Sequence, residues 1–472
     1  MSSAISSLIS GLGSNSAVTS TSSTGNSTST STGLGQGINV NSFVQLSLAG
    51  QQGQITNLQS QQTGIGSELS ALSPIQSDLT ALQTAINALN DPLGVFSSEV
   101  ASSSNASAVN ATATSAASPG AHSIAITSLA TTSSYYSGAV VASTTPLATG
   151  DTFTISAGGS QVATVTTDST HNTLSEIAAA INSQTTAVQA NVINDANGAR
   201  LAIVSTASGA PGNLTVTGGF HLASNDSSIG FTQAVAGTNA VLTVDGVPIS
   251  SATNTVSNVI PGVTLTLGAP TGGTPASLTV APDTTSISGA INNFVSAYNT
   301  AITAINGQFA VAGNGTAPPL EGDNSLRDAQ QQLLSAITYS TSGNGGSVNL
   351  TNLGINVNND GTLSVDSATL SSALSSNLSG VQSFLQTAST GFAANLNSVL
   401  TNLNDPTTGQ LTLDSQGYTS SSSDLANQIS DLQAALAAQT QNLTAVYAQV
   451  NVTLQELPLL QQQLGQQLAS IA

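Results

Sequence analysis

The chain has 472 residues, of which 39% are hydrophobic and only 5% are charged, so its solubility rests on Ser, Thr, Asn and Gln. Arg200 and Arg327 are the only Lys or Arg residues, and 21 acidic residues give a formal net charge of -19. This balance argues against nucleic acid and anionic membranes as partners, because the chain has no basic surface to bind phosphates.

Length and cysteine content limit the number of domains and the kinds of site that the chain can form. A chain of this length usually forms about three domains. The absence of Cys rules out disulfides, thiolate metal sites and a thiol nucleophile. The sequence has no apolar run of the roughly 18 residues that a membrane span needs, and its start, MSSAISSLISGLGS, lacks the basic and apolar regions of a secretory signal. We therefore expect no membrane partner, and export would use another route.

The N-terminal part combines a Ser/Thr-rich segment with a helix. Residues 14–33 lack apolar periodicity, which predicts a flexible segment over residues 1–33. After GLGQGINVNSFV, apolar residues recur at alternating steps of three and four, which predicts a helix with one apolar face. These residues are Leu72, Ile75, Leu79, Leu82, Ile86 and Leu89. Ser73-Pro74 followed by Gln76 resembles a helix N-terminus, so the helix is expected to begin or bend there and to end at Asn90.

The middle of the chain, from about residue 100 to 280, changes to a period of two, which is typical of β-strands. Runs of this kind include HSIAITSLA, DTFTISAGG, ARLAIVSTA and GVTLTLGAP, and TLSEIAAAIN predicts one inserted helix. Residues 242–267, LTVDGVPISSATNTVSNVIPGVTLTL, are expected to form two strands around a turn. We predict a β-rich head domain with the inserted helix at 101–236 and a second β-rich head segment at 237–280.

The C-terminal part returns to helical spacing. Helices are predicted at residues 285–305, in NSLRDAQQQLLSAITYS and in SATLSSALSSNLSGVQSFL. The longest predicted helix covers residues 424–471 and would extend about 70 Å if straight. Its apolar seam comprises Leu425, Ile429, Leu432, Leu436, Leu443, Val446, Val450, Leu457, Leu460, Leu464 and Ile471. Pro458 is expected to bend or shorten this helix, because an internal proline costs about 3 kcal/mol.

These patterns predict an α+β fold. The N- and C-terminal helices, residues 34–100 and 281–472, would pair as a discontinuous, coiled-coil-like leg that carries the two β-rich head domains. Apolar seams at both ends favour assembly with other chains, although an intramolecular helical bundle without a partner explains the same periodicity.

No constellation in the sequence points to catalysis. His122, His171 and His221 lie about fifty residues apart, without a G-x-S-x-G elbow or the spacing of a zinc site, so each is expected in a loop or at the surface. Residues 356–367, NVNNDGTLSVDS, resemble the start of an EF-hand loop, but Ser367 stands where the bidentate Glu belongs, and a hairpin explains the same residues. We expect a protein that is not an enzyme and uses no cofactor or metal.

Five segments, in order along the chain, carry a family resemblance. They are GLGQGINVNSFVQ, FSSEVASSSNASAVNATATSAASPGAHSIAITSLA, TLSEIAAAINSQTTAVQANVINDANGARLAIVST, AVLTVDGVPISSATNTVSNVIPGVTLTL and LGINVNNDGTLSVDSATLSSAL. The first includes a Gly-x-Gly-hydrophobic-Asp/Asn motif, and the third is similar to a module shared by flagellar hook and filament proteins. Together they resemble the bacterial flagellar filament cap family, flagellar hook-associated protein 2.

The resemblance implies the leg-and-head fold and a structural role. In that family several copies form a ring at the tip of the growing flagellum, and exported flagellin subunits fold and insert beneath it. The implied partners are further copies of the chain, flagellin, hook–filament junction proteins and a flagellar export chaperone. The implied location is extracellular, at the flagellum tip.

Seven apolar residues of the C-terminal seam are predicted to contact other copies or filament subunits. They are Leu432, Leu436, Leu443, Val446, Val450, Leu457 and Leu460. Because the chain has no Lys, contacts between subunits are expected to be apolar and hydrogen-bonded, and therefore insensitive to salt.

Two other functions are alternatives: another flagellar axial protein, such as a hook–filament junction protein, or a surface adhesin. The block from VDG to PGVTLTL argues against the first. Aromatic residues amount to 3% and Trp is absent, which gives little support to carbohydrate stacking in the second. The chain also departs from the family pattern, because the Ser/Thr-rich tract separates its start from the Gly-rich motif.

Overall fold

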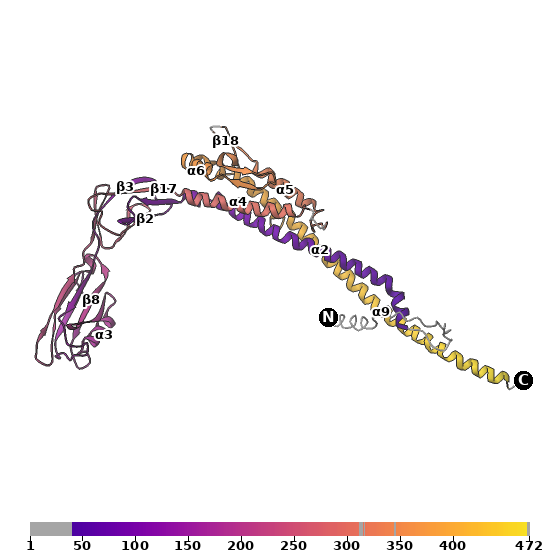
Figure 1. Cartoon of the computed structure of the whole chain (residues 1–472), viewed down its shortest axis with the longest axis horizontal. Coiled ribbons are helices and arrows are strands. Elements are labelled where there is room, and N and C mark those ends of the chain that lie inside the picture. The colour runs from indigo at the N-terminus through magenta and orange to yellow at the C-terminus, as the bar shows by residue number, and fades with distance from the viewer. Residues whose placement is uncertain (1–39, 311–314, 316, 344–345, 470–472) are drawn as a thin grey trace, which may run out of the picture. The chain divides into compact units, whose positions relative to one another are not determined.

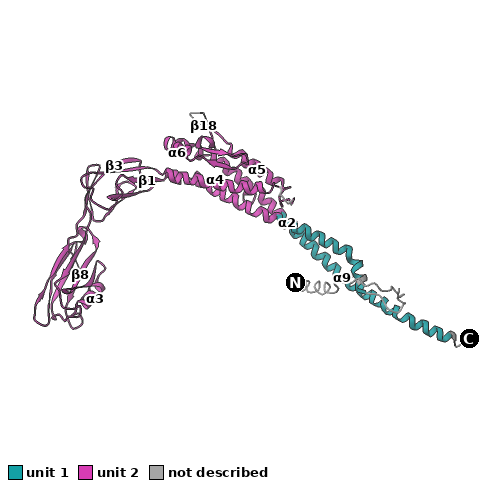
Figure 2. Ribbon diagram, in the orientation of Figure 1, with its two compact units in different colours: residues 1–67, 418–472 teal, residues 68–417 magenta. Residues whose placement is uncertain are grey.

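The computed structural model describes residues 40–310, 315, 317–343 and 346–469 (Figure 1). Contacts within the chain define two compact units, one of Met1–Ser67 with Tyr418–Ala472 and the other of Glu68–Gly417 (Figure 2). Two long helices, α2 (Val40–Asn90) and α9 (Gln410–Ala469), contribute to both units. In the described ranges, no helix is both long and apolar enough to cross a membrane. The predicted flexible segment 1–33 lies outside the described residues.

Helix α2 runs through its internal proline. Of the start or bend predicted at Pro74, the start is wrong, because α2 begins at Val40 and continues past this residue. Leu72 and Ile75, on either side of the proline, are at most 1% exposed, so burial of the apolar face offsets the lost hydrogen bond. The predicted end at Asn90 and the predicted burial of the apolar face are confirmed.

Helix α9 is longer than the sequence predicts. It begins at Gln410 and continues past Pro458 to Ala469, so the predicted shortening at this proline is wrong. A turn precedes the helix, in which Asp405 Oδ1 accepts hydrogen bonds from the backbone N–H groups of Thr407 (2.9 Å) and Thr408 (2.8 Å). The Ser-rich first part of the helix lacks apolar periodicity, so the sequence does not predict that α9 begins at Gln410.

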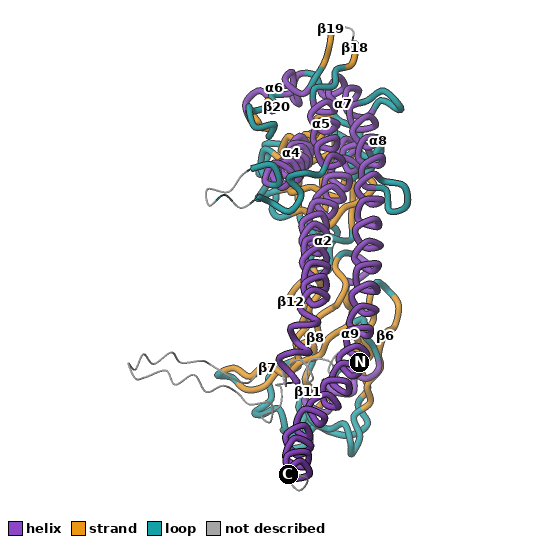
Figure 3. Tube along the Cα trace, turned by 90° about the vertical axis from the view of Figure 1, so that its right-hand side faces the viewer, coloured by secondary structure: helices purple, strands orange, loops and turns teal. Residues whose placement is uncertain are grey.

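Helix α4 (Thr284–Gly307) is central to the helical part of the second unit. The predicted helix at 285–305 is confirmed, and its apolar face is buried. The helices near α4 are α5 (Asn324–Ile337), α6 (Ser367–Ser376), α7 (Leu378–Gln386) and α8 (Phe392–Asn404) (Figures 1 and 3). The ring of Phe392 contacts those of Phe294 and Phe384, each with centroids 5.6 Å apart. The single helix predicted over SATLSSALSSNLSGVQSFL is wrong, because Asn377 ends α6 and caps α7.

Two short hairpins lie among these helices. They comprise β18 (Thr341–Gly343) and β19 (Gly346–Val348), then β20 (Ile355–Val357) and β21 (Leu363–Val365), with the 3-10 turn η3 (Leu350–Leu353) between the hairpins. The predicted hairpin within 356–367 is confirmed. Asp360 Oδ1 accepts hydrogen bonds from the backbone N–H and the hydroxyl of Thr362, and Gly361 has a φ of 82°. Asp360, Gly361 and Thr362 therefore stabilise the turn between β20 and β21.

One β-rich part of the second unit contains two sheets around a shared core. The strand orders are β1-β17-β3-β13-β14 and β15-β16-β2, and all neighbouring strands are antiparallel. The bounds are β1 (Glu99–Ser103), β2 (Val109–Ala113), β3 (Gly120–Ser128), β13 (Ala240–Val244), β14 (Val247–Ser251), β15 (Thr255–Ile260), β16 (Val263–Leu267) and β17 (Ala276–Pro282), after the 3-10 turn η1 (Val95–Ser97). Ile124, Leu242, Leu265 and Leu278 lie in this core and are at most 1% exposed.

Strand pairing joins segments that are distant in the sequence. Leu278 of β17 is paired with His122 of β3, and Val263 of β16 is paired with Ala113 of β2. The division into 101–236 and 237–280 stays a prediction about domains, but the sheets combine strands from both segments. Alternating residues predict where strands form, and they do not predict which distant strands share hydrogen bonds.

Residues 242–267 form parts of four strands, so the prediction of two strands around one turn is wrong. Asp245 (φ 50°) and Gly246 (φ 82°) make the turn between β13 and β14, which fits a two-residue turn with positive φ angles. Gly262 (φ 73°) makes a second turn, between β15 and β16. The stretch is therefore two hairpins, one in each sheet.

The other β-rich part contains the inserted helix. The predicted helix in TLSEIAAAIN is confirmed as α3 (Leu174–Gln184), which Thr173 and Glu176 begin with a capping box. The strand orders are β12-β4-β8-β7, β6-β5-β9 and β10-β11. The bounds are β4 (Thr132–Ser137), β5 (Thr152–Ala157), β6 (Ser160–Thr166), β7 (Val188–Asp195), β8 (Gly198–Ser208), β9 (Leu214–Gly218), β10 (Phe220–His221), β11 (Ser228–Ile229) and β12 (Phe231–Val235), with the 3-10 turn η2 (Ala210–Gly212). Phe153, Ile177, Ile203 and Phe220 lie in one core between these elements.

Candidate assembly surface of the terminal helices

In the first unit, the beginning of α2 packs antiparallel to the later part of α9. The hydroxyl oxygens of Ser47 and Tyr447 lie 3.5 Å apart, and Gln62 Nε2 donates a hydrogen bond to the carbonyl oxygen of Ser422 (3.3 Å). Antiparallel helices advance in opposite directions, so the Ser47–Tyr447 contact places Val40 at about the level of Leu454, and the Gln62–Ser422 contact places it at about the level of Thr444. The part of α9 after Leu454 therefore extends past the described part of α2.

Apolar side chains hold this helix pair together. Val44, Leu48 and Ile55 of α2 are 4%, 6% and 2% exposed, and Ile429 of α9 is 7% exposed. The three α2 residues are four and seven positions apart, so they share one helix face. The N-terminal helix thus has an apolar face of its own in this unit, ahead of the face that begins at Leu72.

The chain covers the seven predicted contact residues of α9 only in part. Leu432, Leu436 and Leu443 are partly buried. The other four lie nearer the C-terminus and are clearly exposed. Their exposed fractions are 57% for Val446, 42% for Val450, 36% for Leu457 and 56% for Leu460. Contact with another chain stays a prediction for all seven residues, and the last four have the accessibility that such contact needs.

A shallow hollow lies on the same stretch of α9. Val446, Gln449, Val450, Thr453 and Leu454 line it. The Thr453 hydroxyl donates a hydrogen bond to the carbonyl oxygen of Gln449 (3.1 Å), one turn earlier in the helix. With this hydroxyl satisfied within the helix, the hollow offers mainly methyl groups, and it suits an apolar side chain of a partner.

Charge is nearly absent from this helix pair. Residues 40–67 contain no ionisable side chain, and residues 418–469 contain Asp424, Asp431 and Glu456 together with Tyr418 and Tyr447. The remaining polar residues are mainly Gln, Ser, Thr and Asn. Association through this surface would therefore depend on apolar burial and neutral hydrogen bonds.

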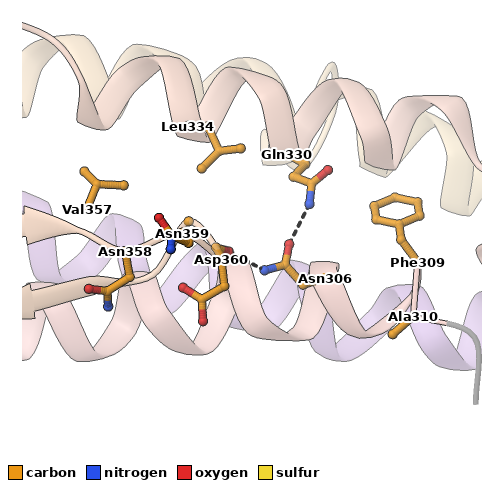
Figure 4. Close-up of a pocket in the computed structure, with 10 residues that line it drawn as sticks. Asn306, Phe309, Ala310, Gln330, Leu334, Val357, Asn358, Asn359 and Asp360 are labelled. Carbon is orange, nitrogen blue, oxygen red and sulfur yellow. Dashed lines mark hydrogen bonds between the residues drawn. The ribbon is translucent and has the colours of Figure 1, made fainter.

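A second hollow lies in the other unit, between α4, α5 and the β20–β21 turn (Figure 4). Its polar side chains bond mainly to one another. Gln330 Nε2 donates to Asn306 Oδ1, and Asn306 Nδ2 donates to the carbonyl oxygen of Asp360 (2.8 Å). The Arg327 guanidinium lies over the ring of Phe309, 4.7 Å from its centroid. This arrangement joins the elements around the hollow and gives the Asn306 and Gln330 side chains hydrogen-bond partners within the chain.

Each histidine is bonded to an aspartate in the β-rich parts. The Nδ1 atoms of His122, His171 and His221 lie 2.7, 3.2 and 3.0 Å from carboxylate oxygens of Asp245, Asp168 and Asp151, respectively. The hydrogen bond from His122 lowers the pKa of Asp245, and those from Thr170 lower the pKa of Asp168 to about 2.

The three histidines lie on strands or in a loop of the β-rich parts. His122 lies on β3, His221 lies on β10, and His171 lies in the loop before α3, so the prediction of loop or surface positions holds in part. Among the described residues, no group of three or more His, Cys, Asp or Glu side chains could hold a metal ion.

Sequence reasoning missed two sets of apolar residues on the terminal helices. Val44, Leu48 and Ile55 belong to a helix that the sequence placed later, although their spacing of four and seven is a helical signal. Val452 and Leu459 of α9 are 55% and 61% exposed but lie off the predicted seam. Their spacing of seven is the pattern that would have shown a second apolar face.

Comparison with known proteins agrees with this architecture. Residues 36–133 match the family model described as the flagellar hook-associated protein 2 N-terminus, and residues 237–458 match the one described as its C-terminus. The B-type flagellar hook-associated protein 2 of Pseudomonas aeruginosa is 32% identical over 352 residues, which cover 68% of this chain and 72% of that protein. The flagellar hook-associated protein 2 of Escherichia coli K12 is 31% identical over 258 residues, which cover 50% of this chain and 54% of that protein.

A solved structure shares the fold. The crystal structure of the D1-D2-D3 domains of the flagellar cap protein FliD from Escherichia coli has a TM-score of 0.54 and 32% sequence identity to this chain. The alignment covers 74% of this chain and 99% of that one. Terminal helices with a β-rich middle, both family models and the relative from Pseudomonas aeruginosa lead to one conclusion. The chain belongs to the flagellar hook-associated protein 2 family of filament cap proteins.

Proposed function

We propose that this protein caps the tip of a bacterial flagellar filament as a ring of identical copies, beneath which exported flagellin folds and inserts. Membership of the cap family supports the role. The observation that carries the assembly is the apolar surface of α9, where Val446 and Leu460 remain more than half exposed in the single chain. Apolar side chains gathered on a nearly uncharged helix gain stability when another subunit covers them.

The proposed partners follow from this location. Further copies would meet at the legs, and flagellin and the hook–filament junction proteins would be the neighbours along the filament. An export chaperone would cover apolar helical surface before assembly. The working location is extracellular, at the flagellum tip. The role is structural, and it requires positioning and shielding of flagellin without a chemical step.

Gene deletion in the source bacterium tests the capping role. We expect bare hooks in electron micrographs together with abundant soluble flagellin in the medium, because export would continue while assembly fails. Normal filaments in the deletion strain would contradict the proposal and would favour an adhesin.

The control is complementation with the wild-type gene and with a Leu443→Asp/Val450→Asp variant. The wild-type gene should restore filaments. The variant should leave flagellin in the medium while being exported itself, which immunoblotting of the medium would show.

A further inference from the structure

The C-terminal part of α9 exposes apolar side chains on two faces. The first stripe consists of Val450, Leu457, Leu460 and Leu464, which are 42%, 36%, 56% and 61% exposed. The second stripe consists of Val452 and Leu459, which are 55% and 61% exposed. Successive residues of an α-helix are about 100° apart, so Leu457 and Leu459 point roughly 200° apart. Val452 and Leu459 are seven residues apart and share a face. Leu460 lies about 100° from Leu459, so the two stripes occupy separate faces of the helix whose centres are roughly 135° apart.

The described part of α2 leaves both stripes accessible. Val40 lies no further along α9 than about the level of Leu454, so the described part of α2 does not reach the level of Leu457, Leu459 and Leu460. The contact with α2 is made through Tyr447, which lies about 120° around the helix from Leu459. The second stripe thus faces away from the side on which α2 packs.

Two apolar stripes on separate faces of one helix call for two neighbours. A surface helix in a single contact has one apolar face, whereas a helix that is apolar on two separate faces is covered on both. A contact between two copies that uses the same patch on each gives a dimer, whereas a closed ring built from one repeated contact needs two different patches on every subunit. The two stripes of α9 meet that requirement.

Charge favours a second copy as the occupant. The chain carries a formal net charge of -19, so copies repel one another over most of their surface. Residues 440–469 contain one charged side chain, Glu456, and it lies between the two stripes. Two copies can approach most closely where carboxylates are sparse, and this stretch of α9 is such a place.

We propose that, in the assembled cap, the first stripe of one α9 packs against the second stripe of the α9 of the next copy, so that each α9 lies between two others. This inference rests on the proposed ring and adds the two surfaces of α9 that would form its repeated contact. The apolar contact surface then includes Val452, Leu459 and Leu464 besides the seven seam residues predicted as contacts.

The test measures the mass of the full-length protein by light scattering after size-exclusion chromatography, over a range of concentrations. The first-stripe variant is Leu457→Gln/Leu460→Gln, and the second-stripe variant is Val452→Gln/Leu459→Gln. The matched control, Leu93→Gln/Val141→Gln, removes two side chains that are 85% and 88% exposed and lie outside α9. Circular dichroism should show unchanged helix content in all three, because every altered side chain is exposed.

We expect wild-type protein and control to form the ring, and each stripe variant alone to be a monomer of 46.5 kDa. An equimolar mixture of the two stripe variants should give a heterodimer of twice that mass and nothing larger, because one intact first stripe and one intact second stripe remain. Homodimers of either variant would mean that like stripes pair, which would overturn the inference.

Three further outcomes would also overturn it: a wild-type-sized ring from either variant, a wild-type chain that stays monomeric at every concentration, or normal rings that have lost only their attachment to filaments. The last would assign the stripes to flagellin. Gene deletion tests capping separately, so capping can hold while the stripe contact fails.

Discussion

The hydroxyl oxygens of Ser47 and Tyr447 lie 3.5 Å apart, although 400 positions separate the two residues in the sequence. This contact joins the first described turns of α2 to the later part of α9, so the leg pair of the first unit forms only when both ends of the chain meet. Closing so long a loop costs conformational entropy, which the burial of Val44, Leu48 and Ile55 must offset. The leg is therefore sensitive to changes in its apolar contacts.

The double substitution Leu443→Asp/Val450→Asp should abolish assembly, because it places two carboxylates on the apolar seam of a nearly uncharged helix, at the partly buried Leu443 and the exposed Val450. The mass of the purified protein and swimming motility are the measurements. The matched control is Gln441→Asp/Asn442→Asp, which adds the same charge at exposed polar positions of the same helix. An unchanged oligomer mass together with normal motility would show that these residues make no leg contact.

Assembly should respond little to salt. Residues 40–67 of α2 and 418–469 of α9 contain no basic side chain, so intersubunit salt bridges cannot contribute between these segments, and screening by salt has little attraction to weaken. The oligomer mass should stay constant between about 0.1 and 1 M NaCl, or rise slightly because screening reduces repulsion between the acidic copies. Dissociation at moderate NaCl would contradict an apolar interface.

Replacing Asp414 by Asn should stabilise the second unit at neutral pH. Burial raises the pKa of the Asp414 carboxyl, and Asp323 raises it further, against a lowering hydrogen bond with Ser325. Oδ2 of Asp414 is buried without a hydrogen-bond partner among the described residues. The folded state therefore binds a proton at the Asp414 carboxyl more tightly than the unfolded state does.

The sign of the pH dependence follows from that raised pKa. Protonated Asp414 contributes stability at low pH, and the contribution is lost as the pH rises through the raised pKa of the folded state. Asp414→Asn mimics the protonated form. Its melting temperature should exceed that of the wild type at pH 7, and the difference should shrink as the pH falls toward the ordinary carboxyl range. An equal difference at all pH values would contradict this account.

Tyr298→Phe should maintain or raise stability. The Tyr298 side chain is fully buried beside Phe294, and its hydroxyl has no hydrogen-bond partner among the described residues. A buried polar group without a partner costs about 1–3 kcal/mol, and removing the oxygen removes that cost. Urea unfolding of the purified protein measures the difference. The comparison variant is Leu79→Ala, which should lower the free energy of unfolding by about 2–5 kcal/mol, because it leaves a cavity where the fully buried Leu79 side chain of α2 packs. A marked loss of stability in Tyr298→Phe would indicate an unseen partner for the hydroxyl.

Local periodicity predicted much of the secondary structure. The apolar faces of α2 and α4 are buried as the steps of three and four predict, and the N-cap residue and Glu of α3 stand where the helix begins. Local reasoning failed at the prolines. Pro74 and Pro458 each cost a hydrogen bond, yet both lie inside helices, and at Pro74 burial of the flanking residues supplies the compensation that a local rule omits.

The sequence by itself determined the order of the helical and β-rich segments, the near absence of charge and the family, because these depend on residue type and short spacing. The tertiary structure alone decided which distant segments meet. It paired Leu278 with His122 and Val263 with Ala113, and it brought Tyr447 beside Ser47. It also showed that Val452 and Leu459 stay exposed on a face of α9 away from α2. The reason is physical: spacing fixes which face of an element is apolar, whereas the burial of that face depends on partners that are distant in the chain.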